Sequence, residues 1–166
     1  MNNSKKIAIY PGTFDPITFG HLDIIKRALQ IVDHLIIAIA KDTSKNPLFS
    51  VAQRIELVKK EVANLDAGRN VEVVGFEGLL INFAREKNSK ILIRGLRAVS
   101  DFEFEFQMSG MNSKLDPEIQ TIFLPASEST HFVASRLVKE VARLGGDVSG
   151  LVSKNVESEL HKILRR

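Results

Sequence analysis

The chain has 166 residues, of which 44% are hydrophobic and 26% are charged. This length and composition predict one globular domain over residues 1–166, able to bury about two-thirds of its unfolded surface. The absence of cysteine excludes disulfides, thiolate metal sites and a cysteine nucleophile. No apolar run approaches the roughly 20 residues of a membrane helix, and residues 1–6 contain no signal-peptide core, so we expect a cytoplasmic protein with no membrane partner.

Positive charge is in slight excess, with a net charge of +3 from 23 Lys and Arg against 20 Asp and Glu. The basic residues are scattered along the chain and form no stripe interleaved with aromatic side chains, the pattern typical of nucleic-acid binding. We therefore expect no nucleic-acid partner. A modest positive excess suits small phosphorylated substrates equally well.

The first predicted elements are a strand and a helix joined by a short loop. The apolar run at residues 6–10 predicts the strand, and the proline and glycine residues between 11 and 16 indicate a turn. Gly20 and His21 then open a helix whose apolar periodicity continues to residue 32. This arrangement places His21 at a helix N-terminus, where free backbone N–H groups and the helix dipole attract phosphate.

Four further apolar, β-rich runs follow, with helical patterns between them. One of these helices begins at Ser50, whose hydroxyl can cap it while Gln53 reaches back, with apolar positions 55, 58 and 62 facing inward. Alternating strands and helices predict a single α/β domain with a five-stranded parallel sheet, in Rossmann-like or flavodoxin-like order, and a helical C-terminal part from Ser135 to Arg166. The predicted strands are 7–10, 35–40, 71–74, 91–93 and 119–124, and residues 67–70 are predicted to form a turn.

Residues 102–106 carry two conflicting signals. Phenylalanine alternates with glutamate at period two, which is typical of a half-buried strand. Ser100 with Glu103 can form a capping box and Phe102 with Phe106 an i,i+4 pair, which indicate a helix. From these residues alone both interpretations stand.

Two common nucleotide-binding loops, G-x-x-x-x-G-K-[ST] and G-x-G-x-x-G, do not occur in the sequence. Ligands of an open parallel sheet bind beyond the carboxyl ends of the strands, which are followed here by Thr13, Lys45, Arg94 and the segment after Leu124. A turn hydroxyl, a solvated lysine and a surface arginine are the ordinary interpretations of these side chains. Asp15 suits a turn or a place near phosphates. Because the residues that follow the strands share one edge of the sheet, we expect them to form one phosphate-binding site.

The segment Thr18-Phe19-Gly20-His21 resembles the (H/T)-x-G-H signature of the nucleotidylyltransferases. The likeness continues in order along nearly the whole chain and is with the phosphopantetheine adenylyltransferase family, which takes part in coenzyme A synthesis. This resemblance favours the helix at residues 102–106. The other matching segments are residues 12–16, Lys45, residues 93–97, residues 101–105 and residues 138–142.

The resemblance implies a role for each matching position. His21 would stabilise the transition state by donating a hydrogen bond to the α-phosphate of ATP. Thr13, Lys45 and Arg94 would orient the attacking phosphate of the acceptor, and Leu80 would contact its pantetheine arm. The implied ATP-binding residues are Thr13, Phe14, His21, Gly95, Leu96, Arg97, Glu105, Thr130, His131, Phe132, Val133, Ala134, Ser135 and Arg136.

The likeness loosens in the segment that would hold adenine. Family members usually carry an aromatic residue where Thr130 stands and consecutive serines where Ala134 and Ser135 stand. A stacking contact and one hydroxyl are therefore missing, while backbone N–H groups at the helix N-terminus remain. We expect weaker or differently organised adenine recognition with an unchanged reaction.

The implied reaction transfers AMP from ATP to 4′-phosphopantetheine and gives dephospho-coenzyme A and pyrophosphate. Mg²⁺ is expected as a cofactor bound mainly through substrate phosphates, with no metal site built from protein side chains. The resemblance also implies a homohexamer and coenzyme A as a further ligand. Two alternatives remain: a nucleotidylyltransferase with another acceptor, and a non-catalytic nucleotide-binding or nucleic-acid-binding module of the same fold.

Overall fold

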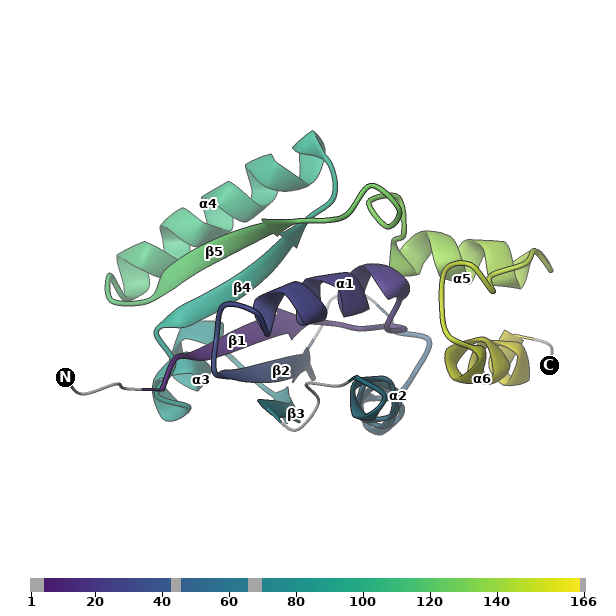
Figure 1. Ribbon diagram of the computed structural model, residues 1–166, viewed down its shortest axis with the longest axis horizontal. Helices are drawn as coiled ribbons and strands as arrows, with labels where there is room; N and C mark the ends of the chain where they lie inside the picture. The colour runs from purple at the N-terminus through teal and green to yellow at the C-terminus, as the bar shows by residue number, and fades with distance from the viewer. Residues whose placement is uncertain (1–4, 43–45, 66–69, 165–166) are drawn as a thin grey trace.

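The computed structural model describes residues 5–42, 46–65 and 70–164. Strands and helices alternate along the chain until two helices end it (Figure 1). In chain order the elements are β1 (Ile7–Gly12), α1 (Phe19–Ala28), β2 (His34–Ala40), α2 (Val51–Ala63), β3 (Val71–Phe76), α3 (Leu80–Glu86), β4 (Ile91–Leu96), α4 (Val99–Leu115), β5 (Gln120–Pro125), α5 (Ser135–Arg143) and α6 (Lys154–Leu164).

The strands form one five-stranded sheet in the order β3-β2-β1-β4-β5, and every neighbouring pair is parallel. The predicted α/β fold is confirmed, and of the two strand orders considered the Rossmann-like one is correct. The chain moves outward from β1 to β3 and then crosses back to β4 on the other side of β1. The order therefore reverses between β1 and β4, which is where open α/β sheets bind ligands.

Helices cover both faces of the sheet. Ala8 and Tyr10 pack into a hydrophobic cluster with side chains of α1, α2, α5 and α6, whereas Ile9 points to a second cluster with α3. The Phe102 ring of α4 meets Phe123 of β5 at 6.0 Å between centroids, on the α3 face of the sheet. Figure 1 shows α5 and α6 beyond the carboxyl ends of the strands.

Several predicted boundaries need correction. Strand β1 continues through Pro11 and Gly12, because the described pairs of β1 with β4 end at Ile9–Leu92 and proline is tolerated where a ladder has stopped. Helix α1 ends at Ala28 although its apolar pattern continues. The turn predicted at residues 67–70 lies outside the described residues except for Asn70.

Helix α4 settles the ambiguity at residues 102–106. The segment is helical, and Phe102 and Phe106 pair with ring centroids 5.6 Å apart, as predicted. The capping box from Ser100 is wrong, because the helix begins at Val99 and its N-cap Ala98 makes no side-chain hydrogen bond. In the described part of the chain, no helix combines the length and apolarity needed to cross a membrane.

Candidate active site

The site lies where strands β1 and β4 separate. Strand β1 pairs with β2 as far as Gly12–Ile39, but its described pairs with β4 are only Ala8–Ile91 and Ile9–Leu92. Beyond these pairs, Nη1 of Arg94 donates to the carbonyl oxygen of Pro11 at 2.9 Å. A side chain thus replaces the missing ladder at the point where the strand order reverses.

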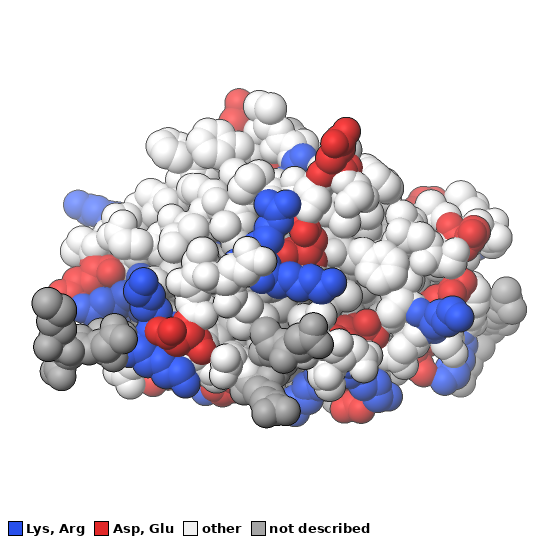
Figure 2. All heavy atoms as spheres, viewed as in Figure 1, with Lys and Arg blue, Asp and Glu red and all other residues white. Residues whose placement is uncertain are grey.

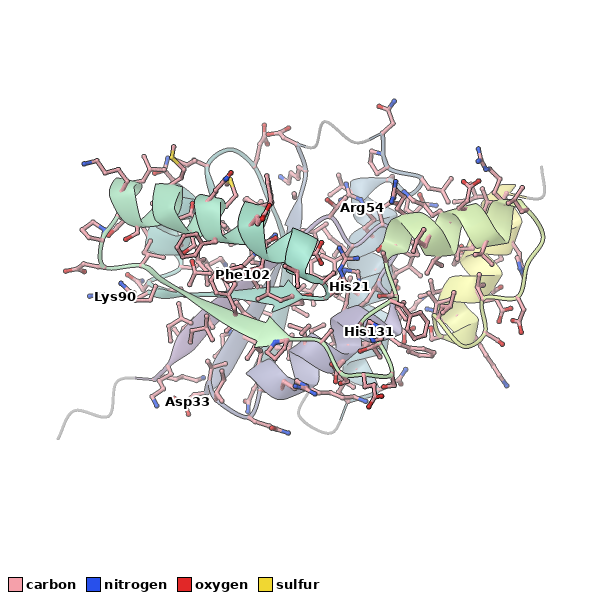
Figure 3. The ribbon with its side chains drawn as sticks, turned by 90° about the horizontal axis from the view of Figure 1, so that it is seen from above. His21, Asp33, Arg54, Lys90, Phe102 and His131 are labelled. Atoms are coloured by element: carbon pink, nitrogen blue, oxygen red, sulfur yellow. The ribbon has the colours of Figure 1, made fainter. Side chains whose placement is uncertain are left out.

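His21 is part of a capping box at the start of α1. The Thr18 hydroxyl accepts from the His21 backbone N–H at 3.4 Å, and the Thr18 backbone N–H donates to Nδ1 of His21 at 3.0 Å. Because Nδ1 accepts this hydrogen bond, the ring proton of neutral His21 lies on Nε2. The T-x-G-H motif therefore fixes both the ring and its tautomer. In Figure 3, His21 lies between α4 and α5.

The His21 imidazole is neutral at physiological pH. Burial, reinforced by the positive charge of Arg97, lowers its pKa from 6.5 to about 4. Its ring packs against Phe14, with 4.9 Å between the ring centroids. The side chain is consequently a preorganised, uncharged N–H donor, which suits a phosphate oxygen that gains charge during a reaction.

Phe14 reaches the site only with its backbone. Its ring is 2% exposed and meets Tyr10 edge-on at 5.3 Å, while its φ of 50° lies in the left-handed region. A Cβ atom at Gly12 would come within 2.8 Å of this ring, so glycine is required there. The resemblance placed Phe14 among the ATP-binding residues, and only its peptide groups are available for such a contact.

A buried charged cluster that the sequence did not reveal holds this loop. Arg54 is 1% exposed and donates to the carbonyl oxygens of Thr13 at 2.8 Å, Ala40 at 2.9 Å and Phe49 at 3.2 Å. Burial lowers the pKa of Arg54, opposed by nearby Asp15. The signal that could have found Arg54 is its position on the buried stripe of α2, three residues before Leu57.

Asp15 lies in a turn with Pro16, as one of its two interpretations predicted, and its carboxylate has a structural role there. Its carboxylate is 4% exposed and accepts from the backbone N–H groups of Leu48 and Phe49, both at 2.9 Å, and from the Lys139 ammonium at 2.5 Å. These bonds tie the loop after β1 to the segment before α2 and to α5. The carboxylate is fully occupied within the protein, so a phosphate-side role for Asp15 is unsupported.

Arg94 and Glu105 form one unit. The Nε and Nη2 atoms of Arg94 donate to the two carboxylate oxygens of Glu105, each at 2.6 Å. Burial opposes the charge on Arg94, but the hydrogen bonds and charge of Glu105 raise its pKa above the usual value. The resemblance put Arg94 on the acceptor side and Glu105 on the ATP side, whereas here the two side chains are joined.

Arg97 lies at the end of the same strand and is paired in a similar way. Its Nε donates to the Asp101 carboxylate at 3.1 Å, and its side chain is 42% exposed. Such an exposed pair contributes little to stability and is readily exchanged for another anion.

The segment implied to bind adenine docks against the start of α1. The Ser135 hydroxyl donates to the carbonyl oxygen of Pro16 at 2.8 Å, and a Cβ atom at Gly20 would lie 3.2 Å from the carbonyl oxygen of Val133. The Val133 side chain is buried, so its peptide groups alone are available to a ligand. The exposed side chains of this segment are those of His131, Phe132 and Arg136.

The other predicted site residues lie at neighbouring strand ends. Gly95 and Leu96 close β4, and Leu80 opens α3 and packs against the cluster around Ile9 on the face opposite α1. Lys45 lies outside the described residues. The described part of the chain contains no group of three or more His, Asp or Glu side chains able to hold a metal ion.

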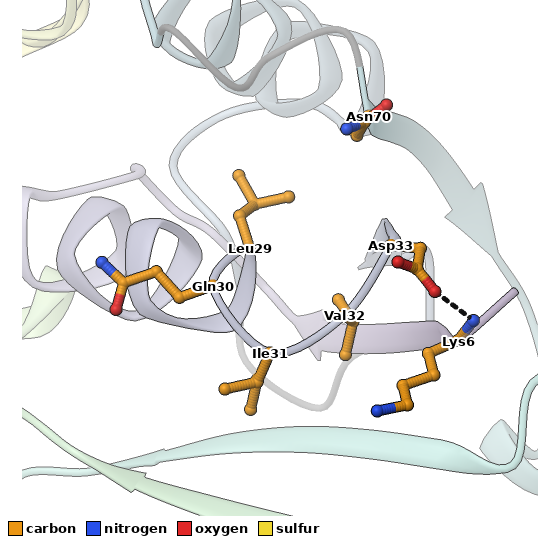
Figure 4. Close-up of a pocket in the computed structure, with 7 residues that line it drawn as sticks. All are labelled: Lys6, Leu29, Gln30, Ile31, Val32, Asp33 and Asn70. Carbon is orange, nitrogen blue, oxygen red and sulfur yellow. Dashed lines mark hydrogen bonds between the residues drawn. The ribbon is translucent and has the colours of Figure 1, made fainter.

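A hollow of about 540 Å³ lies at the opposite, amino-terminal edge of the sheet (Figure 4). There the Lys6 backbone N–H donates to the Asp33 carboxylate at 2.7 Å, and these two residues directly precede β1 and β2 in the sequence. It contains none of the predicted site residues, so we do not assign the reaction to it. Its lining residues are Lys6, Leu29, Gln30, Ile31, Val32, Asp33 and Asn70.

Solved structures share this fold. A putative nicotinate-nucleotide adenylyltransferase from Vibrio parahaemolyticus has a TM-score of 0.69 at 22% identity, covering 95% of this chain and 92% of that one. The nicotinic acid mononucleotide adenylyltransferase of Plasmodium falciparum, solved in complex with NaAD, has a TM-score of 0.70 at 15% identity, covering 95% of both chains. At these identities the likeness concerns the fold alone.

Sequence relatives identify the family more closely. The cytidylyltransferase-like family matches residues 9–141. The phosphopantetheine adenylyltransferase of Wolbachia pipientis subsp. Culex pipiens (strain wPip) is 59% identical over 165 residues, covering 99% of this chain and 97% of its own. That of Rhodospirillum centenum is 52% identical over 161 residues, covering 96% and 88%. The chain belongs to the cytidylyltransferase-like family of nucleotidyltransferases and, within it, to the phosphopantetheine adenylyltransferases.

Proposed function

We propose that this protein transfers the adenylyl group of ATP reversibly to 4′-phosphopantetheine, giving dephospho-coenzyme A and pyrophosphate. We propose the cytoplasm, which supplies ATP, as the compartment of this reaction. The observation that carries the proposal is the neutral Nε2–H donor of His21, fixed in its capping box beside the point where β1 and β4 separate. Thr13 and Arg94 lie at the same edge of the sheet, as expected of groups that hold phosphates.

The proposed reaction needs no general base. The second pKa of a phosphate monoester is about 6, so the acceptor phosphate is already largely a dianion at neutral pH. One of its oxygens attacks the α-phosphorus of ATP, and the bond from that phosphorus to the pyrophosphate oxygen breaks. Negative charge that develops on the α-phosphate oxygens is met by the Nε2–H of His21. The protein's contribution is alignment and charge stabilisation.

Arg94 is assigned to the acceptor phosphate, with Glu105 holding it in place. Glu105 occupies Nε and one N–H of Nη2, and Pro11 accepts from Nη1. One N–H each on Nη1 and Nη2 therefore remains for a phosphate, which guanidinium groups bind well. Thr13 and Lys45 complete the acceptor side in this proposal, and Leu80 contacts the pantetheine arm.

ATP is assigned to the other side of His21, between Arg97 and the start of α5. Arg97 can exchange its exposed pair with Asp101 for ATP phosphates. Gly95 and Leu96 would line the nucleotide with their backbone, as would residues 130–135. Coenzyme A is chemically similar to the product, dephospho-coenzyme A, and would therefore bind at the same place.

Mg²⁺ is proposed to bind through the phosphates of ATP. His21, Arg94 and Arg97 are hydrogen-bond donors that suit phosphate oxygens, and the two carboxylates beside them, Glu105 and Asp101, are paired with the arginines. Bound to the ATP phosphates, Mg²⁺ would neutralise charge on the triphosphate. Pyrophosphate release at fixed ATP should therefore rise with Mg²⁺ until the nucleotide is saturated.

We also propose that copies of this chain associate through α4, as part of a homohexamer. Phe102 faces the sheet, yet Val99, Phe104, Phe106 and Met111 are each at least 60% exposed. Large apolar side chains on the outward face of a helix are normally covered, and the same patch on two copies of a chain can cover itself across a two-fold axis. Figure 2 shows that the surface over α4 is largely free of charged side chains. Sedimentation velocity should give a hexamer for the wild type and smaller species for Phe104→Asp.

The experiment that tests the reaction is pyrophosphate release with ATP, Mg²⁺ and a panel of acceptors. The proposal predicts turnover with 4′-phosphopantetheine above that with nicotinate mononucleotide or other phosphate monoesters. Preference for another acceptor would support a nucleotidylyltransferase of different specificity. ATP binding with no turnover on any acceptor would support the non-catalytic alternative.

A further inference from the structure

Helix α1 holds the segment that follows β5 through one carboxylate. Oδ2 of Asp23 accepts from the backbone N–H of Ser127 at 3.0 Å and lies 3.4 Å from the donating hydroxyl of Thr130. Asp23 is two residues beyond His21 on the same helix. A single side chain therefore connects the proposed transition-state donor's helix with the proposed nucleotide segment.

Arg27, one turn further along α1, supports the same connection. Its Nε donates to Oδ1 of Asp23 at 3.3 Å, its Nη2 to the Ser127 hydroxyl at 3.0 Å and its Nη1 to the Pro125 carbonyl oxygen at 3.3 Å. Asp23 and Arg27 together bind the chain at the point where β5 ends. Burial opposes ionisation of Asp23, but the hydrogen bonds from Ser127 and the charge of Arg27 hold its pKa below the usual value.

The bound segment is then shaped by Ser127. The backbone N–H groups of Thr130 and His131 donate to the Ser127 carbonyl oxygen at 3.0 Å and 2.9 Å, and that of Val133 donates to the Thr130 carbonyl oxygen at 3.0 Å. The position of Ser127 therefore sets the positions of the peptide groups that follow it. These are the groups that the proposed function assigns to adenine and phosphate.

We propose that Asp23 is a positioning residue for the nucleotide: through Ser127 and Thr130 it fixes residues 127–134 relative to His21 without touching the substrate itself. This inference rests on the proposed function. It predicts that loss of the carboxylate weakens ATP binding, while binding of the acceptor is unchanged, because the described acceptor residues follow β1 or lie on β4 and α3. It also assigns the Thr130 hydroxyl to Asp23 rather than to the nucleotide.

Asp116 provides a matched control at the other end of β5. Its carboxylate accepts from the Glu118 backbone N–H at 3.0 Å and from Nε of Arg85 at 2.7 Å, so it shares the backbone and arginine partners of Asp23 and lacks only a hydroxyl. It lies between α4 and β5, at the edge of the sheet opposite the site. Asp116→Asn therefore removes an equivalent set of interactions away from the nucleotide.

The test compares wild type, Asp23→Asn and Asp116→Asn. Titration calorimetry with a non-hydrolysable ATP analogue, steady-state pyrophosphate release and thermal melting are measured on one preparation of each. Because Asp23→Asn weakens the hydrogen bonds that fix the nucleotide segment, it should raise the Kd of the analogue about tenfold. The KM for 4′-phosphopantetheine should stay within about twofold of the wild-type value, and Asp116→Asn should leave both constants unchanged.

Thr130→Val gives a second route that does not depend on the stability of Asp23→Asn. It should weaken analogue binding in the wild type and have no further effect in the Asp23→Asn background, because the hydroxyl acts through that carboxylate. Unchanged analogue binding in both single variants would overturn the proposal, as would equal weakening by Asp116→Asn. A wild type that neither binds the analogue nor releases pyrophosphate would instead overturn the proposed function.

Discussion

Two corners of the sheet meet at the site and are built differently. In the β1–α1 corner, residues 12–21, the Thr18 side chain caps helix α1, and buried Arg54 donates a hydrogen bond to the Thr13 carbonyl oxygen. The β4–α4 corner, residues 94–105, begins its helix at Ala98 without a side-chain cap and continues into an exposed apolar surface. Several hydrogen bonds, to Thr18 and to buried Arg54, fix the β1–α1 corner. The β4–α4 corner is held mainly by the ion pairs of Arg94 with Glu105 and of Arg97 with Asp101.

The difference indicates a division of labour. A donor that must meet charge only as it develops benefits from a fixed position and an uncharged ground state, which His21 has. Before phosphate binds, the groups that bind it can be paired with carboxylates, as Arg94 is with Glu105 and Arg97 with Asp101. An incoming phosphate can then share the arginine with the carboxylate or replace the carboxylate. His21 in the first corner would control turnover, and the two arginines of the second corner would control binding.

The largest expected effect is at the first corner. Replacing His21 by alanine removes the N–H donor, and loss of one such preorganised donor typically lowers kcat by about 10²–10³-fold. Calorimetry should give nearly unchanged affinities for ATP and acceptor. Weakened binding at normal kcat would reverse the division between the two corners.

The next effect concerns the stability of that corner. Arg54→Met leaves three buried carbonyl oxygens without a donor, at about 1 kcal/mol each, so the free energy of unfolding should fall by about 3 kcal/mol. Urea unfolding measures it. The control is Arg85→Met, which breaks an exposed pair with Asp116 and should cost less than about 1 kcal/mol. Equal losses of unfolding free energy in the two variants would show that the hydrogen bonds of Arg54 do not stabilise the first corner.

A smaller effect is expected at the second corner. Arg94→Met should lower kcat/KM for 4′-phosphopantetheine by about 10–100-fold, because charge-assisted hydrogen bonds to the phosphate are lost. Unphosphorylated pantetheine should be a poor substrate of the wild type and should lose nothing further in the variant. An equal loss with both acceptors would remove Arg94 from the acceptor phosphate.

The smallest effect is a pH dependence of stability. The pKa of His21 is lowered from 6.5 to about 4 in the folded state, so the unfolded chain binds the proton more readily. Its stabilising contribution is complete above pH 6.5 and is lost as the pH falls through about 4. Between pH 6.5 and 5.5 the wild type should lose about 1 kcal/mol relative to His21→Gln, measured by urea unfolding. A constant difference would mean an unshifted His21.

Much of the fold could be predicted because its signals are local. Apolar runs marked the strands, the Ser50 and Gln53 capping box marked α2, and the T-x-G-H segment marked the helix that carries His21. The family resemblance then connected strand ends that are distant in sequence. At residues 102–106, where phenylalanines point both toward the sheet and away from it, local pattern gave two answers and only the resemblance favoured the correct one.

What escaped prediction depends on long-range contacts. Arg54 and Asp15 are charged residues whose partners are mostly backbone groups, the most distant 41 positions from Arg54 and 34 from Asp15, and no local spacing reveals a carbonyl oxygen that needs a donor. The pairing of Arg94 with Glu105 likewise requires knowing that α4 returns over the end of β4. The cap predicted at Ser100 was wrong because the helix begins one residue earlier, at Val99.

The most direct test of the central claim uses His21→Gln, because glutamine at the third position of a helix completes the same capping box as His21 while lacking the imidazole Nε2–H. Pyrophosphate release and thermal melting are measured on one preparation. The account predicts a melting temperature close to that of the wild type with kcat at least about tenfold lower. A well-folded His21→Gln enzyme with wild-type kcat would contradict the imidazole Nε2–H as the transition-state donor.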